Sequence, residues 1–216
     1  MKVLFTSAAI FFCLLIVSCS KHSSGPNPGS GKNSLFPLTQ GSVWYYTDSA
    51  FSDSTLLAAY LDTMTLNNKT YQDQQTGMIF LGLNNPYGWF LGSYIAVDPS
   101  NAAIYEVDSP YYQAYTFFAV PQQDGQVIGT GSDNSNPSCL LTTTQTGYLT
   151  PVTINGYSCL ENVEYTADCS GNPKEQIDSY VAQGTGVVRI VHYVPDSATG
   201  NLYEDYSQTL SSAVIK

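Results

Sequence analysis

The sequence predicts a mainly β protein: an antiparallel meander that forms a strongly curved sheet or half-barrel, with a β-sandwich as the alternative and little helix. Short apolar or alternating runs recur along residues 34–216, and turn residues separate them about every eight to twelve positions. Helix signals are weak, because the best candidate, 54–61 (STLLAAYL), is only about two turns long. Consecutive strands joined by short turns favour antiparallel neighbours.

The first expected strands lie between residues 43 and 128. The run 43–47 is rich in aromatic and other strand-favouring residues. The run 61–66 is expected to turn at Asn67-Asn68 and return through 70–71 as a hairpin. The other expected strands of this part are bounded by Asn, Asp, Gly or Pro and cover 77–83, 89–97, 103–107, 115–120 and 127–128.

The second half of the chain has clearer strand signals. Asn155-Gly156 lies between the expected strands 151–154 and 157–165 and is the strongest hairpin signal, because Asn and Gly both tolerate positive φ. Further strands are expected at 177–182, at 187–194, which is rich in β-branched residues, and at 202–210.

The charge balance excludes a nucleic-acid partner. The chain has 7 basic and 17 acidic residues, a formal net charge of -10, and only 11% of its residues are charged. So few and scattered basic side chains cannot neutralise a phosphate backbone. A hydrophobic content of 43% and an aromatic content of 13% indicate a folded core rather than a disordered chain.

Residues 1–18 have the pattern of a lipoprotein signal peptide. The apolar stretch 3–17 has about 15 residues, fewer than the about 20 that span a bilayer. It ends in LIVSC at 15–19, which resembles the bacterial lipobox. The small Ser18 permits cleavage at the next residue, and the thiol of Cys19 accepts diacylglycerol. An ordinary cleaved signal or an uncleaved anchor is the alternative.

Residues 19–33 are expected to be the lipidated cysteine and a flexible tether. The stretch 20–33 (SKHSSGPNPGSGKN) is rich in Gly, Ser, Pro and Asn, and as a flexible coil it reaches roughly 20 Å. Ser20, rather than Asp, after the acylated cysteine resembles the sorting signal for the outer membrane. We therefore expect an outer-membrane lipoprotein whose single β-rich domain is 34–216. Exposure on the periplasmic or the outer surface is left open.

Several short motifs resemble a group of uncharacterised bacterial envelope lipoproteins. They are Phe36-Pro37-Leu38 with Gly41 and Trp44-Tyr45, Asn68-Lys69-Thr70-Tyr71, Pro121 with Gly125, Asn155-Gly156 with Cys159-Leu160 and Val163, and the closing Gly184-Thr185-Gly186-Val187-Val188-Arg189. The resemblance implies a mainly β body, similar to the lipid-carrier half-barrels of the envelope, and it brings no established activity.

Three cysteines remain once Cys13 is removed with the signal and Cys19 is acylated. The oxidising envelope permits a disulfide. Cys139 with Cys159 is the favoured pair, and Cys169 is the alternative partner. On one straight strand Cys159 and Cys169 would lie about 33 Å apart, so that pairing needs a bend between them. Three free thiols are the remaining alternative.

Aromatic residues beside turns form the candidate ligand platform. Rings in these positions can stack on a sugar, and they are Tyr87, Trp89, Phe90, Tyr111, Tyr112 and Tyr115. The alternative interpretation is structural, since tyrosine is a favourable residue on a half-buried sheet.

We recognise no catalytic or metal-binding constellation and expect no cofactor and no metal. His192 is the only histidine after residue 33, and it alternates with Val191 and Tyr193 as a strand residue does. Neither Cys-x-x-Cys nor G-x-S-x-G nor a P-loop occurs. Glu161 and Glu164 could in principle serve glycoside hydrolysis, although carboxylates on a solvated strand are commoner.

The expected function is therefore a non-catalytic binding or structural module that a lipid holds at the outer membrane. A glycan-binding surface lipoprotein and a carrier of lipid or another hydrophobic ligand are the alternatives, and a hydrolase is a weaker one. The sequence predicts neither the identity of the ligand nor the oligomeric state.

Overall fold

A computed structural model describes residues 34–39, 41–52, 55–72, 78–84, 94–98, 100, 102–107, 115–133 and 140–216. All regular elements in these ranges are strands. They are β1 (Val43–Ser52), β2 (Thr55–Gln72), β3 (Ile79–Asn84), β4 (Tyr94–Val97), β5 (Ala103–Val107), β6 (Tyr115–Ala119), β7 (Gln126–Asp133), β8 (Leu141–Ile154), β9 (Tyr157–Ala167), β10 (Pro173–Ala182), β11 (Gly186–Pro195) and β12 (Leu202–Val214). No helix within the described ranges has the length and hydropathy of a membrane span.

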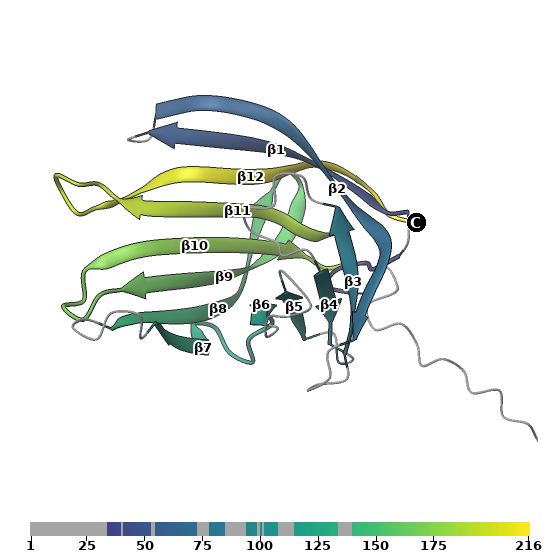
Figure 1. Cartoon of the computed structure of the whole chain (residues 1–216), viewed down its shortest axis with the longest axis horizontal. Coiled ribbons are helices and arrows are strands. Elements are labelled where there is room, and N and C mark those ends of the chain that lie inside the picture. Colours follow the sequence, from purple (N-terminus) through teal and green to yellow (C-terminus); the bar gives the residue numbers. More distant parts are fainter. Residues whose placement is uncertain are drawn as a thin grey trace, which may run out of the picture.

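The strands form one antiparallel sheet that curls strongly (Figure 1). The order is β6-β5-β4-β3-β2-β1-β12-β11-β10-β9-β8-β7, so each strand lies beside its neighbour in the chain, and β1 pairs with β12. The two edge strands, β6 and β7, are consecutive in the chain, and a short connection at 120–125 joins them. The prediction of a mainly β, strongly curved sheet is confirmed, as one nearly closed sheet rather than a sandwich.

The weak helix candidate at 54–61 is not a helix, because the described part of this run belongs to β2. Residues 55–61 pair with β1, with Leu61 opposite Thr47 and Ala58 opposite Ala50. An isolated run of about two turns is too short to be stable as a helix in water. The ladder of hydrogen bonds to β1 offers the same backbone groups partners along the whole run, so tertiary pairing overrides the local helix signal.

The hairpin predicted at Asn155-Gly156 is confirmed. Ile154 at the end of β8 pairs with Tyr157 at the start of β9. Asn155 has a φ of 50° and Gly156 a φ of 83°, the left-handed values that a two-residue hairpin turn requires.

The core is closed at one end of the sheet by the segment 34–38, which precedes β1. Phe36 has no exposed surface, and its ring centroid lies 4.8 Å from that of Trp44. The indole N–H of Trp44 donates to the Thr185 carbonyl at 2.7 Å, and the Tyr46 hydroxyl donates to the Val187 carbonyl at 2.9 Å. These bonds satisfy the polar atoms of two large buried rings and fix β1 against the start of β11.

Edge strand β6 is held by side chains rather than by a second neighbouring strand. The Gln145 amide on β8 donates to the Phe117 carbonyl at 2.9 Å. On β9 the Asn162 amide donates to the Ala119 carbonyl at 2.8 Å, and its oxygen accepts from the Ala119 N–H at 3.5 Å. The outer backbone groups of β6, which an edge strand would otherwise leave unpaired, therefore find partners on the inner face of β8 and β9.

Candidate functional site

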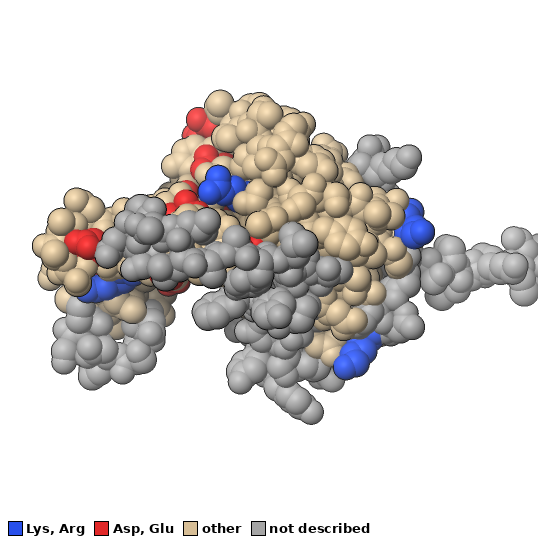
Figure 2. All heavy atoms as spheres, turned by 90° about the horizontal axis from the view of Figure 1, so that it is seen from above, with Lys and Arg blue, Asp and Glu red and all other residues tan. Residues whose placement is uncertain are grey.

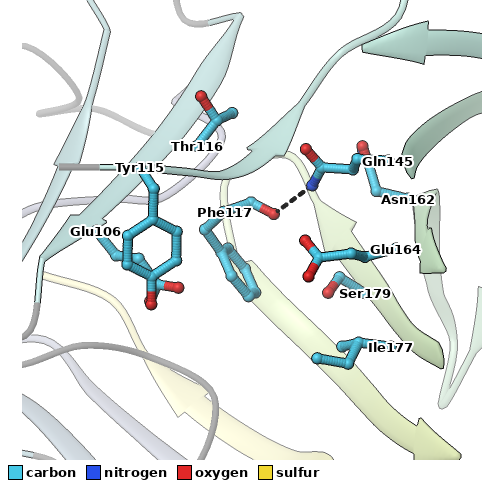
Figure 3. Close-up of a pocket in the computed structure, with 9 residues that line it drawn as sticks. All are labelled: Glu106, Tyr115, Thr116, Phe117, Gln145, Asn162, Glu164, Ile177 and Ser179. Carbon is cyan, nitrogen blue, oxygen red and sulfur yellow. Dashed lines mark hydrogen bonds between the residues drawn. The ribbon is translucent and has the colours of Figure 1, made fainter. Parts of the chain in front are cut away.

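A polar cavity of about 160 Å³ lies where β5 and β6 face the inner side of β8, β9 and β10 (Figure 3). The first pair of strands contributes Glu106, Tyr115, Thr116 and Phe117, and the other three strands contribute Gln145, Asn162, Glu164, Ile177 and Ser179. Most of these side chains carry hydrogen-bonding groups, so the lining of the cavity is mainly polar.

The strand register explains why residues far apart in the sequence meet here. Gln145 pairs with Glu164, and Glu164 pairs with Ile177 on the next strand. Asn162 pairs with Ser179 one row further along. Paired residues of antiparallel strands point to the same face of a sheet, so all five side chains line the inner face.

The cavity is acidic. Glu106 is only 2% exposed, and in Figure 3 its carboxylate lies across the cavity from that of Glu164. Burial, and secondly the charge of Glu175, raises the pKa of Glu164. The residues that line the cavity include no lysine and no arginine.

His192 is a structural group beside the cavity, where it lies opposite Ile177 in the sheet. Its Nε2 lies 2.8 Å from Glu175 and its Nδ1 lies 3.5 Å from Asp205. The hydrogen bond to Glu175 is the main reason why the pKa of His192 is raised, and the same bond lowers the pKa of Glu175. The imidazole is therefore engaged on both sides by carboxylates.

The two carboxylates that the sequence places close together, Glu161 and Glu164, are on opposite faces of β9. Glu161 pairs with Tyr148 and Tyr180, whereas Glu164 pairs with Gln145 and lines the cavity. Residues three apart on a strand alternate in direction. They therefore do not form the carboxylate pair that a glycoside hydrolase needs.

A further buried carboxylate, Asp178, lies on the opposite face of β10 from the cavity. It is 7% exposed and accepts a hydrogen bond from the Gln176 amide at 2.8 Å. Burial is the main cause that raises the pKa of Asp178 from 3.8 to about 6. Because its neighbours already satisfy it, we treat Asp178 as a structural group.

We expect Asp178→Asn to stabilise the protein at neutral pH. The pKa of Asp178 is higher in the folded protein, about 6, than in the unfolded chain, about 4. Its protonated form therefore favours the folded state fully below pH 4, and this contribution is lost as the pH rises through about 6. The shift corresponds to about 3 kcal/mol for a buried group. Urea unfolding at pH 4 and pH 7.5 should give a variant that equals the wild type at pH 4 and is about 2–3 kcal/mol more stable at pH 7.5. A difference independent of pH would contradict this explanation.

Of the predicted aromatic platform, only Tyr115 falls within the described residues. It opens β6, is 50% exposed and lines the cavity. Tyr87, Trp89, Phe90, Tyr111 and Tyr112 lie outside the described residues, so their proposed platform stays a prediction.

The favoured disulfide between Cys139 and Cys159 is not made, because Cys159 is a buried free thiol. Burial raises the pKa of Cys159 to about 11. Cys159 pairs with Val152 near the start of β9. His192 lies in the row of Glu164 and Ile177, and Glu164 is about 16 Å further along β9 than Cys159. Thiol and imidazole are therefore not brought together. Cys169 takes part in a disulfide. The three cysteines that could be its partner, Cys13, Cys19 and Cys139, lie outside the described residues.

We expect the partner of Cys169 to be Cys139. Thr142 at the start of β8 pairs with Ala167 at the end of β9, so the chain that enters β8 passes close to Cys169. Opening a cross-link around a loop of about 30 residues should lower the free energy of unfolding by about 2–4 kcal/mol. Mass spectrometry of unreduced peptides should show the Cys139–Cys169 link, unchanged in the control Cys159→Ser. A link from Cys169 to any other cysteine would refute the assignment.

A second hollow, of about 400 Å³, lies near the segment that closes the core. It is lined mainly by apolar side chains, among them Leu35, Val120, Leu160 and Val181, and also by the Cys159 thiol. We call it the apolar groove. Its chemistry matches a hydrocarbon chain rather than a polar ligand.

The sequence did not single out Glu106, Gln145, Asn162 or Ser179. Each is an ordinary polar residue in an expected strand or between two of them, and only the register places them around one cavity. The signal in the structure is that all four polar side chains are buried. No group of three His, Cys, Asp or Glu side chains in the described ranges is arranged to hold a metal ion.

One face of the molecule shows how the charged side chains of the described residues are distributed. Figure 2 shows a face on which uncharged residues dominate and the lysine and arginine side chains in view are scattered rather than clustered. This face therefore offers no cluster of basic side chains to an anionic ligand, among the residues that the structure describes.

The chain matches no known protein family and no curated protein. Two solved structures resemble it. One, from Bacteroides fragilis, is of a protein inferred to be exported and has a YmcC-like fold; it is 12% identical, covers 83% of this chain and 98% of its own, and has a TM-score of 0.48. The other, from Parabacteroides distasonis, is of a protein inferred to be a lipoprotein; it is 13% identical, covers 84% of this chain and 99% of its own, and has a TM-score of 0.38. Neither likeness is close enough to bring an activity, a ligand or a location to this chain.

Proposed function

We propose that this chain is an outer-membrane lipoprotein of the cell envelope and that its β domain is a non-catalytic binding module. The anchor rests on the sequence, through the lipobox that ends at Cys19 and the tether at 20–33. Several acyl chains on one cysteine hold a protein firmly on a membrane, whereas a single chain binds marginally.

The polar cavity is the observation that carries the binding function. It combines buried polar side chains from the four strands β5, β8, β9 and β10 around a space of about 160 Å³. Buried polar groups normally have hydrogen-bond partners, and the buried Ser179 hydroxyl, which lines the cavity and has no partner among the described residues, is placed to find one in a ligand.

Non-catalytic binding is the interpretation that the side chains favour. The two described groups most suited to nucleophilic or acid–base chemistry are engaged or unreactive: His192 lies between Glu175 and Asp205, and the pKa of Cys159 is raised to about 11. A nucleophile needs the opposite, a lowered pKa or an adjacent base.

The anchor is tested by Cys19→Ala in the full-length chain. We expect the variant to lose acyl labelling and to leave the membrane fraction, because the thiol is the attachment point. Cys13→Ala, which removes the other cysteine of the leader, is the matched control and should keep both properties. Retention of the Cys19→Ala protein in the outer membrane would contradict the anchor.

The binding function is tested by calorimetric titration of the mature lipoprotein in detergent with a panel of small glycans and their monosaccharides. Saturable binding that Ser179→Ala weakens would support the cavity as the site. Absence of binding by every compound, together with an absence of co-purified ligand, would contradict a binding module.

A lipid carrier is the second candidate function, and the apolar groove favours it. Native mass spectrometry of the mature protein should then show acyl chains in addition to its own anchor. Leu160→Asp, which introduces a charge into the groove, should remove them, whereas Glu164→Gln in the polar cavity should not. Spectra that contain only the anchored protein would exclude this function.

A further inference from the structure

We propose that the polar cavity binds a small organic ammonium ion. This inference rests on the proposed binding function and names its ligand class. Four features of the cavity carry it: the donors already in use, the acceptors left over, the charge and the aromatic side chains.

One N–H donor of each amide in the cavity is already in use. Gln145 donates its amide N–H to the Phe117 carbonyl at 2.9 Å, and Asn162 donates to the Ala119 carbonyl at 2.8 Å. These bonds hold edge strand β6 in place. The two amides therefore cannot turn toward a ligand without releasing the strand.

Acceptors, by contrast, are left over. Among the described residues the Glu164 carboxylate and the Ser179 hydroxyl have no hydrogen-bond partner, although Ser179 is only 5% exposed. Figure 3 shows the two side chains next to each other, facing the cavity from β9 and β10. An ionised carboxylate only accepts hydrogen bonds, so the complementary ligand must bring donors.

The charge of the cavity selects a cation. Glu164 and the buried Glu106 lie on two sides of the space, and no lysine or arginine lines it. His192, which lies opposite the lining residue Ile177, is engaged by Glu175 and Asp205. Burial and the charge of Glu175 raise the pKa of Glu164, which reflects a carboxylate without a compensating charge. A bound cation would supply that charge.

The aromatic side chains and the size of the cavity narrow the class further. Phe117 and Tyr115 line the same space as the two carboxylates (Figure 3). A cation near an aromatic face gains a further electrostatic attraction. At about 160 Å³ the cavity is smaller than the roughly 300–1,000 Å³ of sites for drug-sized ligands. An ammonium group with three N–H donors on a short hydroxylated skeleton fits these requirements.

The test is calorimetric titration of the mature full-length lipoprotein in detergent at pH 7 and constant ionic strength. The probes are two amines, ethanolamine and D-glucosamine, each with its neutral counterpart, ethylene glycol and D-glucose. We expect both amines to bind saturably and their neutral counterparts to bind at least about tenfold more weakly, because hydrogen bonds to charged groups are the stronger ones.

The variants assign the binding to the cavity. Glu164→Gln, which keeps the shape and removes the charge, should weaken amine binding about 10- to 100-fold. Glu161→Gln removes one charge from the same strand on the opposite face and should leave the affinity unchanged. Ser179→Ala should weaken binding a few-fold and serves as the second variant if Glu164→Gln does not fold, which circular dichroism would report.

Three outcomes would overturn the inference. They are equal affinity for amines and their neutral counterparts, unchanged amine binding in both Glu164→Gln and Ser179→Ala, and no binding of either amine. In the first case, or if only neutral glycans bind, the ammonium class fails while the binding function stands. If no amine, glycan or lipid binds the wild-type protein, the proposed function fails as well.

Discussion

Gly186→Ala should lower the free energy of unfolding by about 2–6 kcal/mol, since two independent effects act at this position. Gly186 has a φ of 97°, a conformation that residues with a Cβ rarely adopt. A Cβ built there would lie 2.7 Å from Cδ2 and 2.8 Å from Cε2 of Phe36. The Phe36 ring cannot easily yield, because it is fully buried against Trp44, whose indole N–H is bonded to the Thr185 carbonyl.

A matched control separates the clash from the backbone strain. Gly200 has a φ of 72°, and a Cβ there would meet nothing within 4 Å. Gly200→Ala should therefore report the strain alone, about 1–3 kcal/mol. Urea unfolding of both variants at pH 7 measures the difference. Equal losses in the two variants would show that the clash with Phe36 adds nothing to the backbone strain at Gly186.

The fold was predictable where local signals agree with the tertiary pairing. Asn155-Gly156 has the residue types that its positive φ values demand, and the β-branched run at 187–194 is the central part of β11. The run 54–61, the best of the weak helix candidates, is a strand, and its own sequence carries no information about the strand with which it pairs. Only the long pairing with β1 decides its conformation.

The candidate site was less predictable, because it depends on register. Glu106 on β5 and Glu164 on β9 are separated in the sequence by β6, β7 and β8. They line one cavity because the sheet curls until β6 lies against β8 and β9. A shift of one residue in β9 would turn Glu164 to the outer face and bring its neighbours inward. The sequence pattern does not determine that register.

The disulfide prediction failed for a related reason. A hairpin places the end of one strand beside the start of its partner, and in β8–β9 these positions are Ala167 and Thr142. Cys159 lies at the other end of β9, where it pairs with Val152 and lines the apolar groove. Spacing along the sequence could not distinguish the two ends, whereas the observed pairing does.

The other large expected effect is at Asn162, whose side chain takes the place of a neighbouring strand for β6. It is 1% exposed, donates to the Ala119 carbonyl at 2.8 Å and accepts from the Ala119 N–H at 3.5 Å. Asn162→Ala leaves both backbone groups without these partners, and a buried group in that state costs about 1–3 kcal/mol. We expect a loss of about 2–6 kcal/mol in the free energy of unfolding.

The substitution Asn162→Ala should first release β6 and affect the rest of the fold less. Among the described residues, the hydrogen bonds that join β6 to β8 and β9 come from the side-chain amides of Gln145 and Asn162. Amide hydrogen exchange at Ala119 should become faster in Asn162→Ala, while exchange in β10 and β11, which have a neighbouring strand on both sides, should stay slow. Glu161→Ala, on the opposite face of β9, should leave exchange at Ala119 unchanged. Since β6 carries Tyr115 and Phe117 of the cavity, its release should also abolish binding there. Slow exchange at Ala119 in Asn162→Ala would mean that Gln145 alone holds the strand.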